Sequence, residues 1–81
     1  MMPNHPPAID LRLYATLAPL APPNADRFPI ETGMTIGQLL EKTAIPLAEA
    51  KLVFVNGIKA QLSTQLHGGE RVGIFPPVGG G

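Results

Sequence analysis

The stretch Leu52-Val53-Phe54-Val55-Asn56-Gly57 indicates the fold of this chain most directly. Its first four residues are apolar and two of them are β-branched, which is typical of a central strand. Asn-Gly is the strongest short signal for a tight hairpin turn, because both residues tolerate positive φ. We therefore predict a β-hairpin here, with residues 58–60 as its return strand.

A second strand pattern lies near the N-terminus. Residues 9–14 read Ile-Asp-Leu-Arg-Leu-Tyr, an alternation with period two that predicts a strand with one buried face. Residues 18–26 contain three prolines and an asparagine, which favour a loop because proline fixes φ and lacks a backbone donor. A short antiparallel strand should follow at residues 27–31.

A helix is predicted to begin at Ile36. Thr35 and Gln38 have the spacing of a capping box, in which each side chain satisfies the other residue's backbone N–H group. The helix should end near Thr43, since Pro46 disfavours helical geometry in the residue before it. The apolar residues that share one face of this helix are Ile36, Leu39 and Leu40.

The last strand should occupy residues 71–75, after a polar stretch anchored by Leu66 and a turn at Gly68-Gly69. Pro76-Pro77 would end it. The predicted order of strand, strand, helix, strand, short strand, strand belongs to an α+β protein with one main helix packed on one face of a mixed sheet. This arrangement is the β-grasp, or ubiquitin-like, fold.

Length and composition bound the domain organisation and the class of partner. With 81 residues and 44% apolar content, the chain supports one core. We expect a disordered leader at residues 1–8, a ubiquitin-like domain at 9–78 and a flexible glycine tail at 79–81. Six basic and six acidic residues argue against a nucleic-acid or membrane partner. The partner should be a protein.

Absent residue types exclude further chemistry. The chain has no cysteine, which excludes disulfides, thiolate metal sites and a cysteine nucleophile. His5 and His67 lie apart in the sequence, so no metal site is expected. No secretion signal or apolar run of membrane-spanning length is present, which predicts a cytoplasmic protein.

The C-terminal stretch Phe75-Pro76-Pro77-Val78-Gly79-Gly80-Gly81 suits delivery into another protein's active site. Glycines lack a Cβ atom and can thread a narrow channel, and the prolines stiffen the exit from the sheet. Adenylation by ATP would make the terminal carboxylate of Gly81 an electrophile, and a sulfur nucleophile would convert it to a thiocarboxylate. The chain itself needs no catalytic side chain for this chemistry.

These residues resemble the MoaD/ThiS family of ubiquitin-like sulfur carriers, and most closely the small subunit of molybdopterin synthase. The resemblance covers nearly the whole chain after Pro7. Its most specific parts are residues 53–57, 66–72 and 74–78 and the final Gly80-Gly81. The Phe-Pro-Pro-Val ending favours the molybdopterin branch of the family.

The resemblance implies a function and two partners. A ubiquitin-activating-like adenylyltransferase would use ATP to adenylate Gly81, which then becomes a thiocarboxylate. The tail would enter the large subunit of molybdopterin synthase and donate sulfur in molybdenum cofactor biosynthesis. This chain would be the non-catalytic subunit and would bind no cofactor itself. The residues that would contact partners are Tyr14, Phe75, Pro76, Pro77, Val78, Gly79 and Gly80.

Several alternatives stay open at this level. The chain could carry sulfur for thiamine thiazole or tungsten cofactor synthesis, act as a modifier joined to lysines through Gly81, or be an interaction domain with an inert tail. Lys51, Lys59 and Arg71 could steer an acidic partner or simply face solvent. The side of the sheet that Phe75 occupies is undecided, because Val72 and Ile74 are both apolar.

Overall fold

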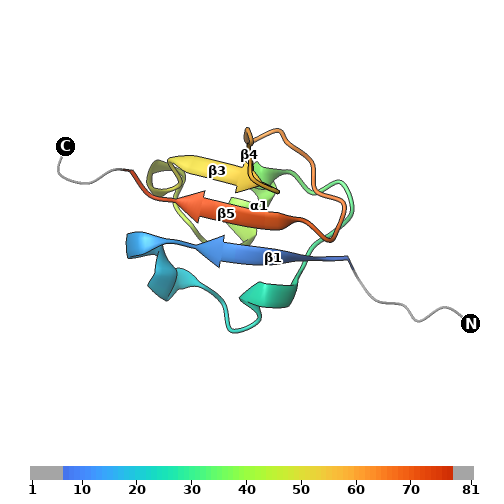
Figure 1. Cartoon of the computed structure of the whole chain (residues 1–81), viewed down its shortest axis with the longest axis horizontal. Helices are drawn as coiled ribbons and strands as arrows, with labels where there is room; N and C mark the ends of the chain where they lie inside the picture. The colour runs from blue at the N-terminus through green and yellow to red at the C-terminus, as the bar shows by residue number, and fades with distance from the viewer. Residues whose placement is uncertain (1–6, 78–81) are drawn as a thin grey trace, which may run out of the picture.

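The fold is built on one mixed sheet of five strands (Figure 1). The structure, a computed structural model, describes residues 7–77. The strands are β1 (Ala8–Leu13), β2 (Phe28–Pro29), β3 (Leu52–Val55), β4 (Ile58–Lys59) and β5 (Arg71–Phe75). Their order across the sheet is β2-β1-β5-β3-β4, with β1 and β5 parallel and every other pair antiparallel.

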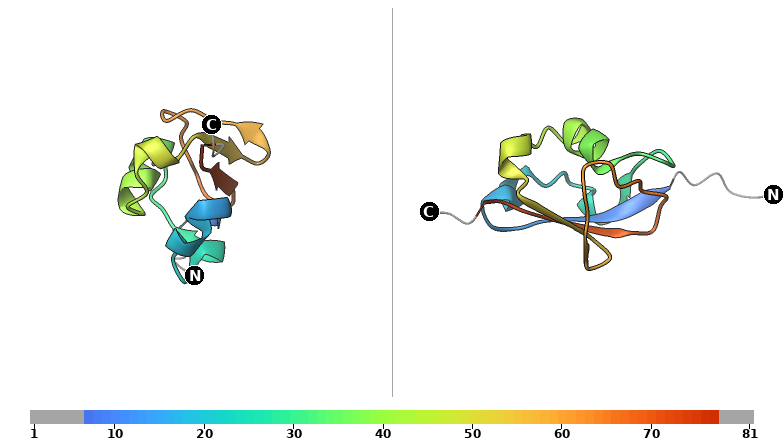
Figure 2. Two further views of the ribbon diagram at one scale, coloured as in Figure 1. Left: turned by 90° about the vertical axis from the view of Figure 1, so that its left-hand side faces the viewer. Right: turned by 90° about the horizontal axis from the view of Figure 1, so that it is seen from above.

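The helix α1 (Ile36–Lys42) packs on one face of this sheet and leaves the other face uncovered (Figure 2). Thr35 Oγ1 accepts a hydrogen bond from the Gln38 backbone N–H at 3.1 Å, and Gln38 Oε1 accepts one from the Thr35 N–H at 3.0 Å. The helix ends with Thr43 as its C-cap. The predicted capping box, helix bounds and α+β architecture are therefore confirmed.

The core lies between α1 and the sheet. The helix contributes Ile36, Leu39 and Leu40, all at most 1% exposed, as its apolar spacing predicted. Leu66 is fully buried beneath the loop before β5, where its backbone N–H and C=O pair with Met34 O and Gly33 N–H at 2.7 Å each. The other buried side chains of the core are Ile9, Leu11, Leu17, Phe28, Ile30, Met34, Ile45, Val53, Val72 and Ile74.

The segment after β1 is more ordered than the predicted loop. It forms two short 3-10 helices, η1 (Ala15–Leu20) and η2 (Ala25–Arg27), and buries Leu17 to 2% exposure. A lone apolar residue among prolines has no periodicity, so its place in the core could not be read from the sequence. A third, η3 (Leu47–Glu49), lies between α1 and β3.

Strand ends differ slightly from expectation. β1 begins at Ala8 rather than Ile9, and the carbonyl of Pro7 accepts a hydrogen bond from the Ile30 N–H at 2.9 Å. β2 has only two residues, because proline at position 29 cannot donate to a ladder. The greater part of the predicted leader and the whole glycine tail lie outside the described residues, so that division stays a prediction.

The predicted hairpin turn is confirmed and has a second role. Asn56 and Gly57 adopt φ of 52° and 82°, as a tight turn with two positive φ values requires. Asn56 Oδ1 accepts a hydrogen bond from the Arg71 backbone N–H at 2.9 Å, and the Asn56 N–H donates to the Arg71 carbonyl at 2.8 Å. The turn thus fixes where β5 begins.

Across residues 7–77, every helix is too short or too polar to span a bilayer.

Candidate functional site

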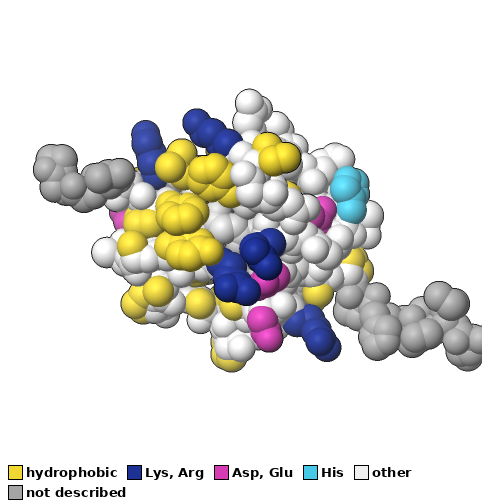
Figure 3. Space-filling view, viewed as in Figure 1, with side chains coloured by type: hydrophobic (Ala, Val, Ile, Leu, Met, Phe, Trp, Pro, Cys, Tyr) yellow, Lys and Arg dark blue, Asp and Glu magenta, His cyan; other side chains and the backbone are white. Residues whose placement is uncertain are grey.

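The candidate site is the face of the sheet opposite α1, which we call the open face (Figure 3). Successive residues of a strand point to opposite faces. In β5, Val72 and Ile74 are 0% exposed and pack into the core, so Arg71, Gly73 and Phe75 belong to the open face. The structure therefore decides the question that the sequence left open: Phe75 is not a core residue.

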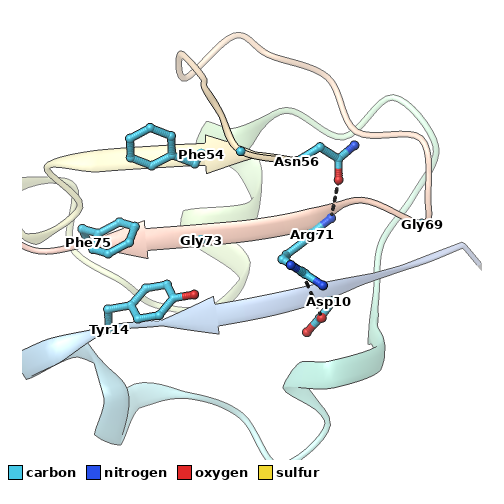
Figure 4. A pocket seen from close by; sticks show the side chains of 9 residues that line it. Asp10, Tyr14, Phe54, Asn56, Gly69, Arg71, Gly73 and Phe75 are labelled. Atoms are coloured by element: carbon cyan, nitrogen blue, oxygen red, sulfur yellow. Dashed lines mark hydrogen bonds and ion pairs between the residues drawn. The ribbon is translucent and has the colours of Figure 1, made fainter.

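Three rings, the aromatic cluster, lie at the end of the open face where β5 finishes (Figure 4). Tyr14 stacks on Phe75 with ring centroids 4.3 Å apart and planes within 7°, and Phe54 meets Phe75 edge-on at 5.8 Å. The Tyr14 N–H donates to the Ile74 carbonyl at 3.1 Å, which extends the pairing of β1 with β5 by one residue. Tyr14 remains 38% exposed, so the cluster presents apolar surface to solvent.

Gly73 lines a shallow hollow of about 750 Å³ that extends from the three rings to Asp10, Arg71 and Gly69. It pairs with Phe54 on β3 and with Arg12 on β1. A Cβ atom at position 73 would lie 3.2 Å from Cε2 of Tyr14. Glycine therefore allows the tyrosine ring to lean over β5, which is what brings it against Phe75.

Asp10, Arg12 and Arg71, the arginine cluster, occupy the other end of the open face. Arg12 Nε and Nη2 donate to the two carboxylate oxygens of Asp10 at 3.0 Å each, and Arg71 Nε lies 3.7 Å from Asp10 Oδ2. The hydrogen bonds from Arg12 lower the pKa of Asp10, with a further contribution from Arg71, and the same bonds raise the pKa of Arg12. Two guanidinium groups share one carboxylate, which leaves the cluster positive.

The turn before β5 is held by Glu70. Its carboxylate accepts hydrogen bonds from the backbone N–H groups of His67 and Gly68 at 2.8 Å each. Partial burial raises the pKa of Glu70, but these backbone hydrogen bonds together outweigh it and leave the pKa below its ordinary value. Gly68 has φ of 120°, and a Cβ there would lie 2.9 Å from Cβ of Pro7, so only glycine fits this close approach.

The predicted partner-contacting residues fall into two groups. Tyr14 and Phe75 are brought into direct contact, and Pro76 and Pro77, half-buried and exposed, directly follow β5. Their roles toward partners stay predictions. The remaining predicted site residues, Val78, Gly79, Gly80 and Gly81, lie outside the described residues.

Other residues of this face were not predicted from the sequence. Phe54 lies in an all-apolar strand, in which alternation does not indicate the face of the sheet that each side chain occupies. The position of Gly73 beneath the rings depends on the register of β5 with β1 and β3. Asp10 and Arg12 were identified only as the polar side of β1. Their spacing of two residues was the available signal, because it places them on one face.

A metal centre finds no support in this part of the molecule. Between residues 7 and 77, no three His, Cys, Asp or Glu side chains lie close enough together to hold a metal ion.

The chain is similar in fold to small archaeal modifiers. It matches the crystal structure of SAMP1 from Haloferax volcanii with a TM-score of 0.65 and 23% identity, covering 91% of this chain and 99% of that one. It also matches the crystal structure of H. volcanii small archaeal modifier protein 1 with a TM-score of 0.69 and 22% identity, over 89% and 99% of the two chains. These likenesses confirm the predicted β-grasp fold.

Curated protein sequences gave no significant match to the chain. The sequence model of the ThiS family matches residues 11–81, which include both ends of β5, the aromatic cluster and the C-terminal glycines. This match spans the sheet, the helix and the tail, and it agrees with the resemblance seen in the sequence. The chain belongs to the ThiS family.

Proposed function

We propose that this protein is a sulfur carrier whose Gly81 carboxylate is adenylated and converted to a thiocarboxylate that donates sulfur in molybdopterin biosynthesis. The observation that carries the proposal is the match to the ThiS family through residue 81. Family and fold together support the broader statement that the chain is a ubiquitin-like sulfur carrier or modifier. The molybdopterin pathway rests on the resemblance of the Phe-Pro-Pro-Val ending.

The proposed chemistry has two steps. An oxygen of the Gly81 carboxylate attacks the α-phosphorus of ATP, and pyrophosphate leaves. A sulfur nucleophile supplied by a partner then attacks the acyl carbon, and AMP leaves as the thiocarboxylate forms. A ubiquitin-activating-like adenylyltransferase would provide ATP binding and the catalytic groups, so the carrier needs only an accessible terminus.

The open face would position that terminus. Phe75 is both the last residue of β5 and the central ring of the aromatic cluster, so a partner that contacts the cluster also holds the start of the tail. The two prolines that follow restrict the backbone between this contact and residue 78. Fixing one end of a short tail raises the effective concentration of its other end in the partner's active site.

The second proposed partner is the large subunit of molybdopterin synthase, which would accept the same tail and the same face after sulfur has been loaded. Because one face serves both partners in this scheme, the two complexes would exclude each other. We place these reactions in the cytoplasm.

The proposal is tested by co-expressing the chain with its adenylating enzyme and a sulfur source and measuring the intact mass. The expected product carries one sulfur in place of one oxygen. The matched control lacks both Gly80 and Gly81, so that it no longer ends in two glycines, and it should stay unmodified. An unchanged wild-type mass beside an active enzyme would contradict the proposal.

A second candidate function is a protein modifier, which the likeness to small archaeal modifier protein 1 favours. Gly81 would then form an isopeptide bond with a lysine of a target protein, and AMP would again be the leaving group. Arg71 is the last basic residue, so trypsin would leave residues 72–81 on each modified lysine. Finding that remnant on other proteins by mass spectrometry would support this function, and its absence from cells that accumulate thiocarboxylate would exclude it.

A further inference from the structure

We infer that the open face recognises an acidic segment of the adenylating partner, with a large apolar side chain seated in the hollow between the aromatic cluster and Arg71 and a carboxylate bound at Arg71. This inference rests on the proposed function, because that function supplies the partner. In the proposed function the partner contacts the aromatic cluster. The inference adds that the arginine cluster determines which partner can bind.

The charge on this face differs from that of the whole chain. The chain carries six basic and six acidic residues. Three basic residues lie on the open face: Arg71, which lines the hollow, Arg12 on β1, and Lys59, which pairs with Phe54 across β3 and β4. Asp10 is shared by both arginines, and Asp26 acts on Arg12 from the sheet edge. Lys and Arg side chains accordingly lie on both sides of the apolar patch (Figure 3).

Arg71 has unused hydrogen-bonding capacity. Its guanidinium group makes no hydrogen bond to other side chains within residues 7–77, its Nε is 3.7 Å from Asp10, and its side chain is 69% exposed. A planar guanidinium group binds a carboxylate through two parallel N–H groups. Arg12, by contrast, already uses Nε and Nη2 on Asp10. Arg71 is therefore the group that would receive a partner's carboxylate.

The two clusters lie in a fixed order relative to the tail. The aromatic cluster is at Phe75, where the chain leaves the sheet, and Arg71 is at the other end of β5 (Figure 4). Four steps along the strand lead from Arg71 to Phe75, or about 13 Å at the rise of an extended chain. The partner's acidic residues should thus lie roughly 13 Å farther from its active-site channel than the residues that contact Phe75.

The test measures adenylation by pyrophosphate exchange with the adenylating enzyme, at several salt concentrations. Arg71→Gln should raise the KM for the carrier by about fivefold at low salt, leave kcat unchanged and weaken the salt dependence of KM. Arg71→Lys should fall between the two. The matched control is Lys42→Gln, which removes the same charge from α1 on the other side of the sheet and should leave KM unchanged. Thermal melts verify that each variant is folded.

The outcomes separate the two proposals. Equal KM and equal salt dependence for wild type and Arg71→Gln, with exchange that requires Gly80-Gly81, would overturn this inference and leave the proposed function standing. Pyrophosphate exchange that persists after deletion of Gly80-Gly81, or no exchange with the wild-type chain, would contradict both proposals. Sedimentation of wild type as a dimer that Arg71→Gln dissociates would assign the face to a second copy and overturn the inference.

Discussion

The two faces of the sheet have different roles, although the same strands form both. On β5, Val72 and Ile74 are fully buried in the core, while Arg71, which is exposed, and Phe75, which is half-buried, lie on the open face. Stability should therefore depend on even-numbered positions of this strand and recognition on odd-numbered ones. Substitutions at adjacent residues should give opposite phenotypes.

The largest expected effect is on the buried face. Ile74→Ala removes a side chain that is 0% exposed and should lower the free energy of unfolding by about 3 kcal/mol, through lost transfer energy and a residual cavity. Urea denaturation followed by circular dichroism measures this change. A loss below about 1 kcal/mol would mean that the core relaxes around the site and that the two faces are less distinct than the burial indicates.

Phe75→Ala tests the open face of the same strand. Losing one stacked and one edge-on aromatic contact should cost about 1 kcal/mol of stability, while binding of the adenylating enzyme should weaken by at least roughly tenfold. Calorimetric titration and a denaturation curve on the same sample separate the two effects. Tyr14→Phe keeps the stacked ring and should behave as wild type, whereas a stability loss in Phe75→Ala equal to that of Ile74→Ala would assign Phe75 to the core.

The Glu70 turn predicts a pH dependence. The pKa of Glu70 is lower in the folded chain than its ordinary value of 4.5, so the unfolded chain takes up the proton first as the pH falls. The stabilisation is thus complete above about pH 4.5 and is lost as the pH falls through the folded pKa. Glu70→Gln should cost at most about 1 kcal/mol at pH 7 and flatten the loss of stability that the wild-type chain shows as the pH falls below 4.5.

Denaturation curves at a series of pH values measure this difference. Glu49→Gln, which removes the same charge from η3 away from this turn, is the control for the change in charge. If Glu70→Gln lost stability with the wild-type slope, the hydrogen bonds to His67 and Gly68 would not be the source of the acid sensitivity.

The smallest expected effect belongs to Asp10. Its ion pairs with Arg12 and Arg71 are on the surface and are screened by solvent, so Asp10→Asn should leave the free energy of unfolding nearly unchanged. Removing the carboxylate frees both arginines and should tighten binding of an acidic partner. A titration at low salt tests this, and weaker binding by Asp10→Asn would show that Asp10 itself contacts the partner.

Much of the fold followed from short-range patterns. The alternation in β1, the capping box of α1 and the positive φ of Asn56-Gly57 each act within a few residues, so the sequence predicted them without tertiary information. Leu17 was missed because its burial depends on how η1 closes over the end of the sheet. The site was predicted only in part: Tyr14 and Phe75 were named, while Phe54 and Gly73 were not.

The sequence by itself determined the order of the elements, the family resemblance and the proposal that Gly81 carries the chemistry. Tertiary structure decided that Phe75 faces outward, that Tyr14 stacks on it across Gly73, and that Asp10 meets two arginines. The physical reason is register. Local sequence sets which residues alternate along a strand, but only the pairing of β1 and β3 with β5, distant in sequence, sets which side chains meet across it.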